Sequence, residues 1–175
     1  NSTCSLTIYD IIFHQDMSFR YHHPAALTIA VSSPGSIEPV FTKTCCNPEN
    51  LVGYYLDEGI FSHTVPKGTP VRSIGLGLMP EFWEQQLPRL LEQDTSQVLS
   101  AACLLDGTFS IPEVELLLHQ MASYVPKAGT ASLRYESKIL DLIAALLEWN
   151  ILSLSIPAVQ SISASDQEVI QNLKH

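Results

Sequence analysis

The spacing of apolar residues changes near Met79, and this change limits the folds that the chain can adopt. Before it, short apolar runs are separated by Gly, Pro, Asn and Asp, a pattern typical of β-strands. After it, apolar residues recur at helical spacing, and Pro, Ser and acidic residues stand where helices begin. The 175 residues suffice for one domain with a hydrophobic core. We therefore predict an α+β protein with a β-rich part over residues 1–79 and a helical part over residues 80–160.

The β-rich part divides into short segments separated by turns such as Pro34-Gly35 and Asn47-Pro48. The predicted strands are 6–8, 10–13, 26–31, 37–44, 51–56, 59–65 and 71–78. Large and small apolar residues alternate within 26–31. Several short strands at regular spacing favour a β-barrel or a sandwich, and the many aromatic residues here favour an interior that encloses a cavity.

Capping residues mark the helix starts of the second part. The predicted starts are Pro80 with Glu81 and Glu84, Asp94 with Gln97, Ser110 with Pro112 and Glu113, and Ser165 with Glu168. Leu87-Pro88 should end or kink the first of these helices, because proline cannot continue the hydrogen-bonding pattern. The longest predicted helix covers residues 131–150.

Helix 131–150 has more apolar surface than a single core-facing stripe requires. One stripe carries Leu133, Leu140, Ile143 and Leu147, and a second carries Ile139, Leu142, Leu146 and Trp149. Neighbouring helices of the same chain can cover both stripes, or a second copy of the chain can cover the first. On the second interpretation the chain is a homodimer, and the first stripe is its interface.

The chain has nine basic and eighteen acidic residues, which gives a net charge of -9. Such a field repels polyanions, so this segment by itself is predicted not to bind nucleic acid. No apolar run reaches the roughly 20 residues of a membrane span, and the first residues lack a signal-peptide pattern. The spacing of the four cysteines (Cys4, Cys45, Cys46 and Cys103) matches no disulfide scaffold. We expect a soluble, cytoplasmic part of a longer chain.

Three segments together resemble one family of bacterial proteins. They are Arg134-Tyr135-Glu136-Ser137-Lys138-Ile139-Leu140 and onward to Glu148, Ser165-Asp166-Gln167-Glu168-Val169-Ile170, and Gly75-Leu76-Gly77-Leu78-Met79-Pro80-Glu81-Phe82-Trp83. The first is similar to the late helix in the regulatory domain of AraC-family transcription regulators. The second is similar to the junction that leads to their DNA-binding half, and the third to the last barrel strand running into the first helix.

This resemblance implies a cupin-like β-barrel or sandwich that binds a small effector, followed by a helical dimerisation subdomain. Residues 161–175 would begin the linker to a DNA-binding half with paired helix-turn-helix units that lies outside this chain. The expected partners are a second copy of the chain, a small-molecule effector, and DNA only through the absent half.

The residues suited to catalysis or metal binding form none of the motifs that such chemistry needs. Cupin-type metal sites use two histidines one residue apart, whereas His22-His23 are adjacent and point to opposite faces of a strand. His63 is the best candidate for a further ligand if a metal binds. Gly75-x-Gly77 lacks the third glycine of a dinucleotide site, and no nucleophile elbow is present. We expect no enzyme activity, no metal and no cofactor.

A small-molecule pocket in the β-rich part remains as the candidate site. Phe19, Tyr21 and His23 share one strand face, and Arg72 shares a face with the apolar residues that follow it. The Arg72 guanidinium would receive an anionic effector between aromatic walls. The alternative is a surface or internally paired Arg72 with ordinary core aromatics. The candidate ligand-binding residues are Phe19, Tyr21, His23, Tyr54, Arg72 and Trp83.

Two other classes of function stay open at this stage. A cupin-like metal-dependent enzyme would hold a stoichiometric metal ion. A dimerisation module without a ligand would have its β interior filled by side chains.

Overall fold

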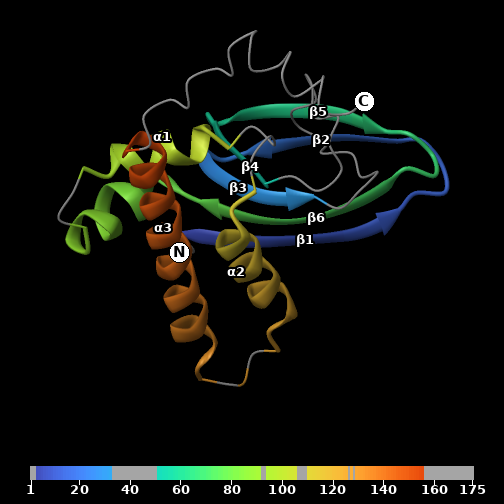
Figure 1. The fold of residues 1–175 in the computed structure, drawn as a ribbon. Helices are drawn as coiled ribbons and strands as arrows, with labels where there is room; N and C mark the ends of the chain where they lie inside the picture. The colour runs from blue at the N-terminus through green and yellow to red at the C-terminus, as the bar shows by residue number, and fades with distance from the viewer. Residues whose placement is uncertain are drawn as a thin grey trace, which may run out of the picture.

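A computed structural model of the chain describes residues 3–32, 51–91, 94–105, 110–125, 127 and 129–155. An antiparallel four-stranded sheet forms its centre, with helices on one face and a two-stranded ribbon on the other (Figure 1). The predicted α+β class is confirmed, with the strands first and the helices after them.

The four-stranded sheet has the order β1-β6-β3-β4. Its strands are β1 (Cys4–Ile12), β3 (Ala26–Ser32), β4 (Leu51–Leu56) and β6 (Pro70–Leu78). The register pairs Leu27 with Leu78 and Ile29 with Leu76, so large apolar residues from adjacent strands gather on one face. The strands predicted at 26–31, 51–56 and 71–78 are confirmed, and those at 6–8 and 10–13 form one strand. The strand predicted at 37–44 lies outside the described residues.

The ribbon consists of β2 (Met17–His23) and β5 (Gly59–Val65), which pair with each other. At one end of the ribbon, the turn that precedes β2 is hydrogen-bonded to the turn that follows β5. The Gly68 N–H donates to the Phe13 carbonyl (2.9 Å), and the Lys67 N–H donates to Asp16 Oδ1 (2.8 Å). Within the described strands the pairing does not continue from the ribbon into the larger sheet. A closed barrel is therefore not formed in this part of the chain, because β1 and β4 remain edges of their own sheet.

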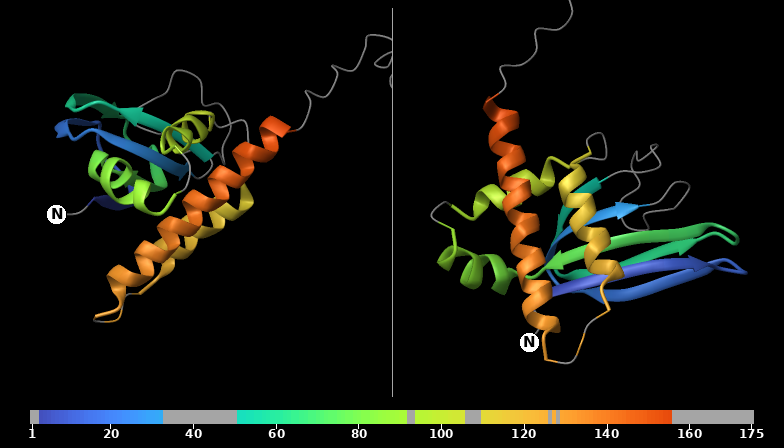
Figure 2. Two further views of the ribbon diagram at one scale, coloured as in Figure 1. Left: turned by 90° about the vertical axis from the view of Figure 1, so that its left-hand side faces the viewer. Right: turned by 60° about the horizontal axis from the view of Figure 1, so that its bottom comes forward.

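Within the described residues, the second part of the chain forms short turns of helix and then three α-helices. These elements are η1 (Phe82–Gln86), η2 (Leu87–Arg89), α1 (Ser96–Cys103), α2 (Pro112–Ser123) and α3 (Ala131–Ser155). Helices α2 and α3 run antiparallel, side by side, as a hairpin (Figure 2). The long helix is confirmed and continues five residues beyond the predicted end at residue 150.

Three of the predicted helix starts differ in detail from the structure. Helix α1 begins at Ser96 after the N-cap residue Thr95, and Asp94 Oδ1 accepts a hydrogen bond from the Ser96 N–H (3.0 Å). The helix expected from Pro80 becomes a π-helical turn, which passes into a 3-10 turn at Leu87-Pro88 because proline has no N–H to donate. At α2 the residue before the helix is Ile111, and Ser110 Oγ donates to Glu115 (2.8 Å) instead of forming the expected capping box with Glu113. The start predicted at Ser165 lies outside the described residues.

One continuous hydrophobic core joins the helices to the four-stranded sheet. It contains Leu27 and Leu76 from the strands together with Leu118 and Leu146 from α2 and α3, so the described strands and helices share it. Helix α1 approaches β4 at Gly53, where a Cβ atom would lie 2.0 Å from the Ala102 carbonyl oxygen. Only glycine permits this approach.

The cysteines of the described part form no disulfide. Cys4 and Cys103 are both free thiols. Cys45 and Cys46 lie outside the described residues.

Candidate functional site

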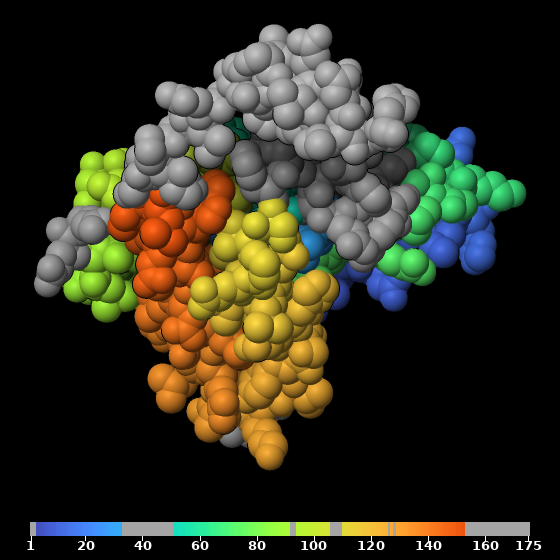
Figure 3. Space-filling view, viewed as in Figure 1, coloured from blue at the N-terminus to red at the C-terminus, as the bar shows by residue number. Residues whose placement is uncertain are grey.

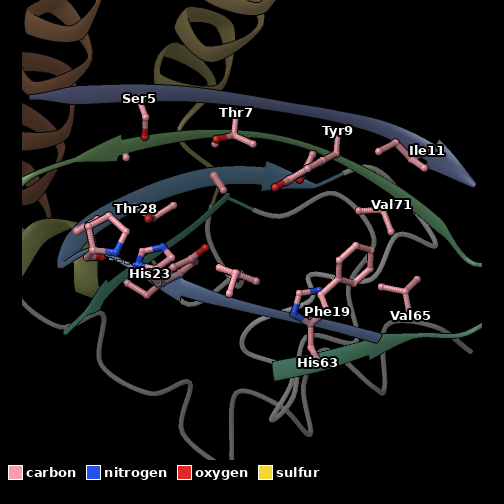
Figure 4. A pocket seen from close by; sticks show the side chains of 18 of the residues that line it. Ser5, Thr7, Tyr9, Ile11, Phe19, His23, Thr28, His63, Val65 and Val71 are labelled. Carbon is pink, nitrogen blue, oxygen red and sulfur yellow. Dashed lines mark hydrogen bonds between the residues drawn. The ribbon is translucent and has the colours of Figure 1, made fainter. Parts of the chain in front are cut away.

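A cavity of about 410 Å³ lies between the four-stranded sheet and the ribbon (Figure 4). Strands β1, β3, β4 and β6 form one wall, and β2 and β5 form the other. The lining residues are Ser5, Thr7, Tyr9, Ile11, Phe13, Phe19, Tyr21, His23, Pro24, Ala26, Thr28, Ala30, Tyr54, His63, Val65, Val71, Ser73, Gly75, Gly77 and Met79. This volume is within the range of natural small-molecule sites.

Small side chains on one face of the sheet leave the space open. Strands β3 and β6 alternate between large residues, which point to the helices, and small ones, which point to the cavity. The small cavity-facing residues are Ala26, Thr28 and Ala30 from β3 and Ser73, Gly75 and Gly77 from β6, and the larger Val71 of β6 also lines the cavity. Because successive side chains of a strand point to opposite faces, this alternation builds a core and a hollow from the same strands.

The ribbon supplies a wall of stacked rings. Phe19 and His63 stack with their centroids 5.1 Å apart and their planes at 23°. Tyr21 meets the same imidazole edge-on at 5.9 Å, and Phe13 packs against Phe19 at 5.5 Å. In Figure 4, Phe19 and His63 lie across the cavity from the β1 residue Thr7. Rings in these offset and edge-to-face arrangements support one another in fixed orientations.

The cavity wall carries no formal charge in the described part of the chain. Its lining there includes no Asp, Glu, Lys or Arg. Desolvation by partial burial lowers the pKa of His63 below its ordinary value of 6.5, which favours the neutral imidazole. The imidazole Nδ1 of His23 hydrogen-bonds the backbone carbonyl of Pro24 at the end of the ribbon. The site is suited to uncharged ligands with rings and hydrogen-bonding groups.

Four of the six predicted ligand-binding residues come together at this cavity. Phe19, Tyr21, His23 and Tyr54 line it. Their role in ligand binding stays a prediction.

The other two predicted ligand-binding residues lie elsewhere. Arg72 faces the helix side of the sheet, where it pairs with Asp10 at 2.9 Å in a separate hollow that His119 of α2 also lines. Trp83 packs against the core, with its ring 5.9 Å from that of Tyr55. Neither residue lines the aromatic cavity.

Sequence reasoning missed the small-residue wall and the position of His63 in the ring stack. The alternation of large and small residues in β3 was the available signal for the wall. His63 was considered only as a metal ligand. Within the described residues, no three His, Cys, Asp or Glu side chains come close enough together to hold a metal ion.

The structure divides the four predicted dimer-interface residues into two pairs. Ile143 and Leu147 are buried in the chain's own core. Leu133 is 72 % exposed, and Leu140 is half-buried and packs against the edge of the core. The outer surface of α3 lies beside that of α2 in the space-filling view (Figure 3).

The family model described as the regulatory protein PchR N-terminal domain matches residues 2–153. The chain belongs to this family. It is therefore the N-terminal domain of a regulatory protein, and the family description names no catalytic activity. No curated protein and no solved structure matches the chain. None of the helices in the described residues combines the length and the hydropathy that crossing a membrane requires.

Proposed function

We propose that the chain is the effector-binding and dimerisation domain of an AraC-type transcription regulator that acts in the cytoplasm. The ring-walled cavity inside a regulatory domain is the observation that carries this proposal. DNA would be bound through a separate half of the protein, since a chain with a net charge of -9 is a poor ligand for a polyanion.

The shared strands offer a route from the cavity to the helices. In β3, Thr28 and Ala30 line the cavity, while Leu27 and Ile29 between them pack in the helix-facing core. A ligand that favours one position of β3 would thereby favour one packing of α2 and α3. An effector acts in this way only if it binds one arrangement better than the other.

A thermal-shift screen of small organic molecules tests the effector site. Ligands of the cavity should raise the melting temperature of the unaltered chain by mass action. They should lose this effect in Gly75→Val, because the added methyl groups would project beside Ala30 and Thr28 in the cavity. Arg72→Gln, which alters the separate hollow, is the matched control and should respond like the unaltered chain. Hits that act equally on Gly75→Val would place the ligand outside this cavity.

Dimerisation is proposed through the outer stripe of α3. The exposed apolar residues Leu133 and Ile151 are 18 positions apart, about five helical turns, so they lie on the same face. Half-buried Leu140 and exposed Ala144 lie between them on that face. This outer stripe retains Leu133 and Leu140 from the predicted interface and replaces the two core residues.

The outer stripe is self-complementary when two copies of α3 run antiparallel. Leu133 then meets Ile151 of the second copy, and Leu140 meets its Ala144. The same register brings Arg134 of one copy near Glu148 of the other, and both are exposed. Such a symmetric interface, in which a patch binds its own copy, is the usual form of a homodimer.

Sedimentation of the chain tests the outer stripe directly. The unaltered chain should be a dimer, and Leu133→Glu should be a monomer of unchanged helix content. Leu116→Glu is the matched control, since Leu116 is a 56 % exposed leucine on α2 and is not part of the stripe. Arg134→Glu should weaken the dimer, and a second change, Glu148→Arg, should restore it. A dimer that persists in Leu133→Glu would remove α3 from the interface.

A further inference from the structure

We propose that the ligand of the cavity is an uncharged, flat ring compound that carries at least one hydrogen-bonding group. This rests on the proposed function, in which the cavity between the sheets is the effector site. The inference follows from the difference between the two walls of the cavity.

The ribbon wall favours flat rings. Phe19 and His63 are stacked on each other, and Tyr21 holds the imidazole from its edge. A second ring pair, His23 and Phe61, lies at the other end of the same ribbon, with the ring centroids 5.5 Å apart. A conjugated ring gains stacking contact from such a wall that a puckered, saturated ring of similar size does not.

The opposite wall, formed by the four-stranded sheet, has short side chains and carries hydroxyl groups. Gly75 has no side chain and so does not project into the cavity. A Cβ atom added there would lie 3.6 Å from the nearest atom of Ala30, which is an ordinary contact. Thr7, Thr28 and Ser73 place hydroxyl groups along this wall. A hydroxyl both donates and accepts, so a ligand with a phenol, amide or ring nitrogen finds a partner in either role.

The absence of charge in the described lining argues against ionic ligands. An anion would lose its hydration without a cation to replace it, and a cation would find no carboxylate. Arg72 and Asp10 neutralise each other on the other face of the sheet. The net charge of -9 further disfavours the approach of anions.

Three bicyclic probes that share a ten-carbon ring skeleton separate these properties. 2-Naphthol is flat and neutral, 2-naphthoate is flat and anionic, and decahydro-2-naphthol is neutral and saturated. NMR titration of the unaltered chain at pH 7 should show 2-naphthol binding about fivefold tighter than the saturated alcohol. 2-Naphthol should also bind at least about tenfold tighter than 2-naphthoate, because the carboxylate would lose its hydration without gaining a charge partner.

A pair of ribbon variants tests the ring wall. Phe19→Leu should weaken 2-naphthol severalfold and leave the saturated alcohol unchanged, because it removes the stacked ring from the lining. Ile60→Ala is the matched control, since Ile60 lies on the opposite face of the same ribbon, is 64 % exposed and does not line the cavity. It should leave the affinity for 2-naphthol unchanged.

The outcomes distinguish the ligand class from the site. If the carboxylate or the saturated alcohol binds as tightly as 2-naphthol, or if none of the three binds, the proposed ligand class is wrong. If Gly75→Val still abolishes the binding of a probe or a screening hit, the effector site stands. If binding is indifferent to Gly75→Val, the site itself is wrong and the proposed function fails with it. The probe series needs no variant, so a variant that does not fold leaves the main test intact.

Discussion

The two faces of the four-stranded sheet are built from the same strands and have opposite properties. On the helix face, Leu27, Ile29 and Leu76 are almost completely buried and belong to the core. On the cavity face, Thr28 and Gly75 from the same strands leave a hollow. The contrast arises inside single strands, where neighbouring residues differ in size and point in opposite directions.

This contrast separates stability from binding. Closely packed apolar side chains supply most of the favourable free energy of folding, so the helix face should dominate stability. On the cavity face, the small side chains make fewer packing contacts and leave the cavity open. Substitutions on it should alter binding and cost little stability.

Neighbouring substitutions in β3 offer the strongest test of this separation. Ile29→Ala should lower the free energy of unfolding by about 3–4 kcal/mol, because it empties a fully buried site. Thr28→Ala, one residue away on the cavity face, should cost less than about 1 kcal/mol. Urea denaturation measures both values. Similar losses in the two variants would mean that the cavity face is packed as tightly as the core.

Two glycines extend the comparison to backbone packing. Gly53→Ala should destabilise the chain by about 2–3 kcal/mol, because the new Cβ would clash with the Ala102 carbonyl of α1. Gly75→Ala should be nearly neutral or slightly stabilising, since its Cβ has room and alanine loses less chain entropy on folding. Thermal unfolding followed by circular dichroism measures both changes. A tolerated Gly53→Ala would show that α1 can move away from β4 at little cost.

The alternation in the sequence was sufficient to predict most described strands and the shared face of Phe19, Tyr21 and His23. It was not sufficient to place Arg72. Period-two alternation separates the two faces of one strand, but it does not tell which face of that strand meets which face of another. That depends on the pairing between strands, such as Arg72 opposite Asp10, which joins residues 62 positions apart.

The same limitation applies to the long helix. Helical spacing correctly indicated that α3 is apolar over more than one stripe. It could not indicate that Ile143 and Leu147 would be buried in the chain's own core while Leu133 stayed exposed. Which stripe is covered follows from the angle at which neighbouring elements pack, and single-helix periodicity does not contain that angle.

The smallest expected effect concerns the pKa of His63 and tests whether the ring wall excludes solvent. Because burial lowers its pKa, His63 should titrate below 6.5 in an NMR pH series of the folded chain. The unfolded chain then binds more protons than the folded one near that pH, so this residue's contribution to stability falls as pH drops through about 6.5. Phe19→Ala removes the stacked ring and should move the pKa of His63 back toward 6.5. A His63 that titrates at or above 6.5 in the unaltered chain would mean that the ring wall is open to water, and both the stack and the flat-ring ligand would lose their support.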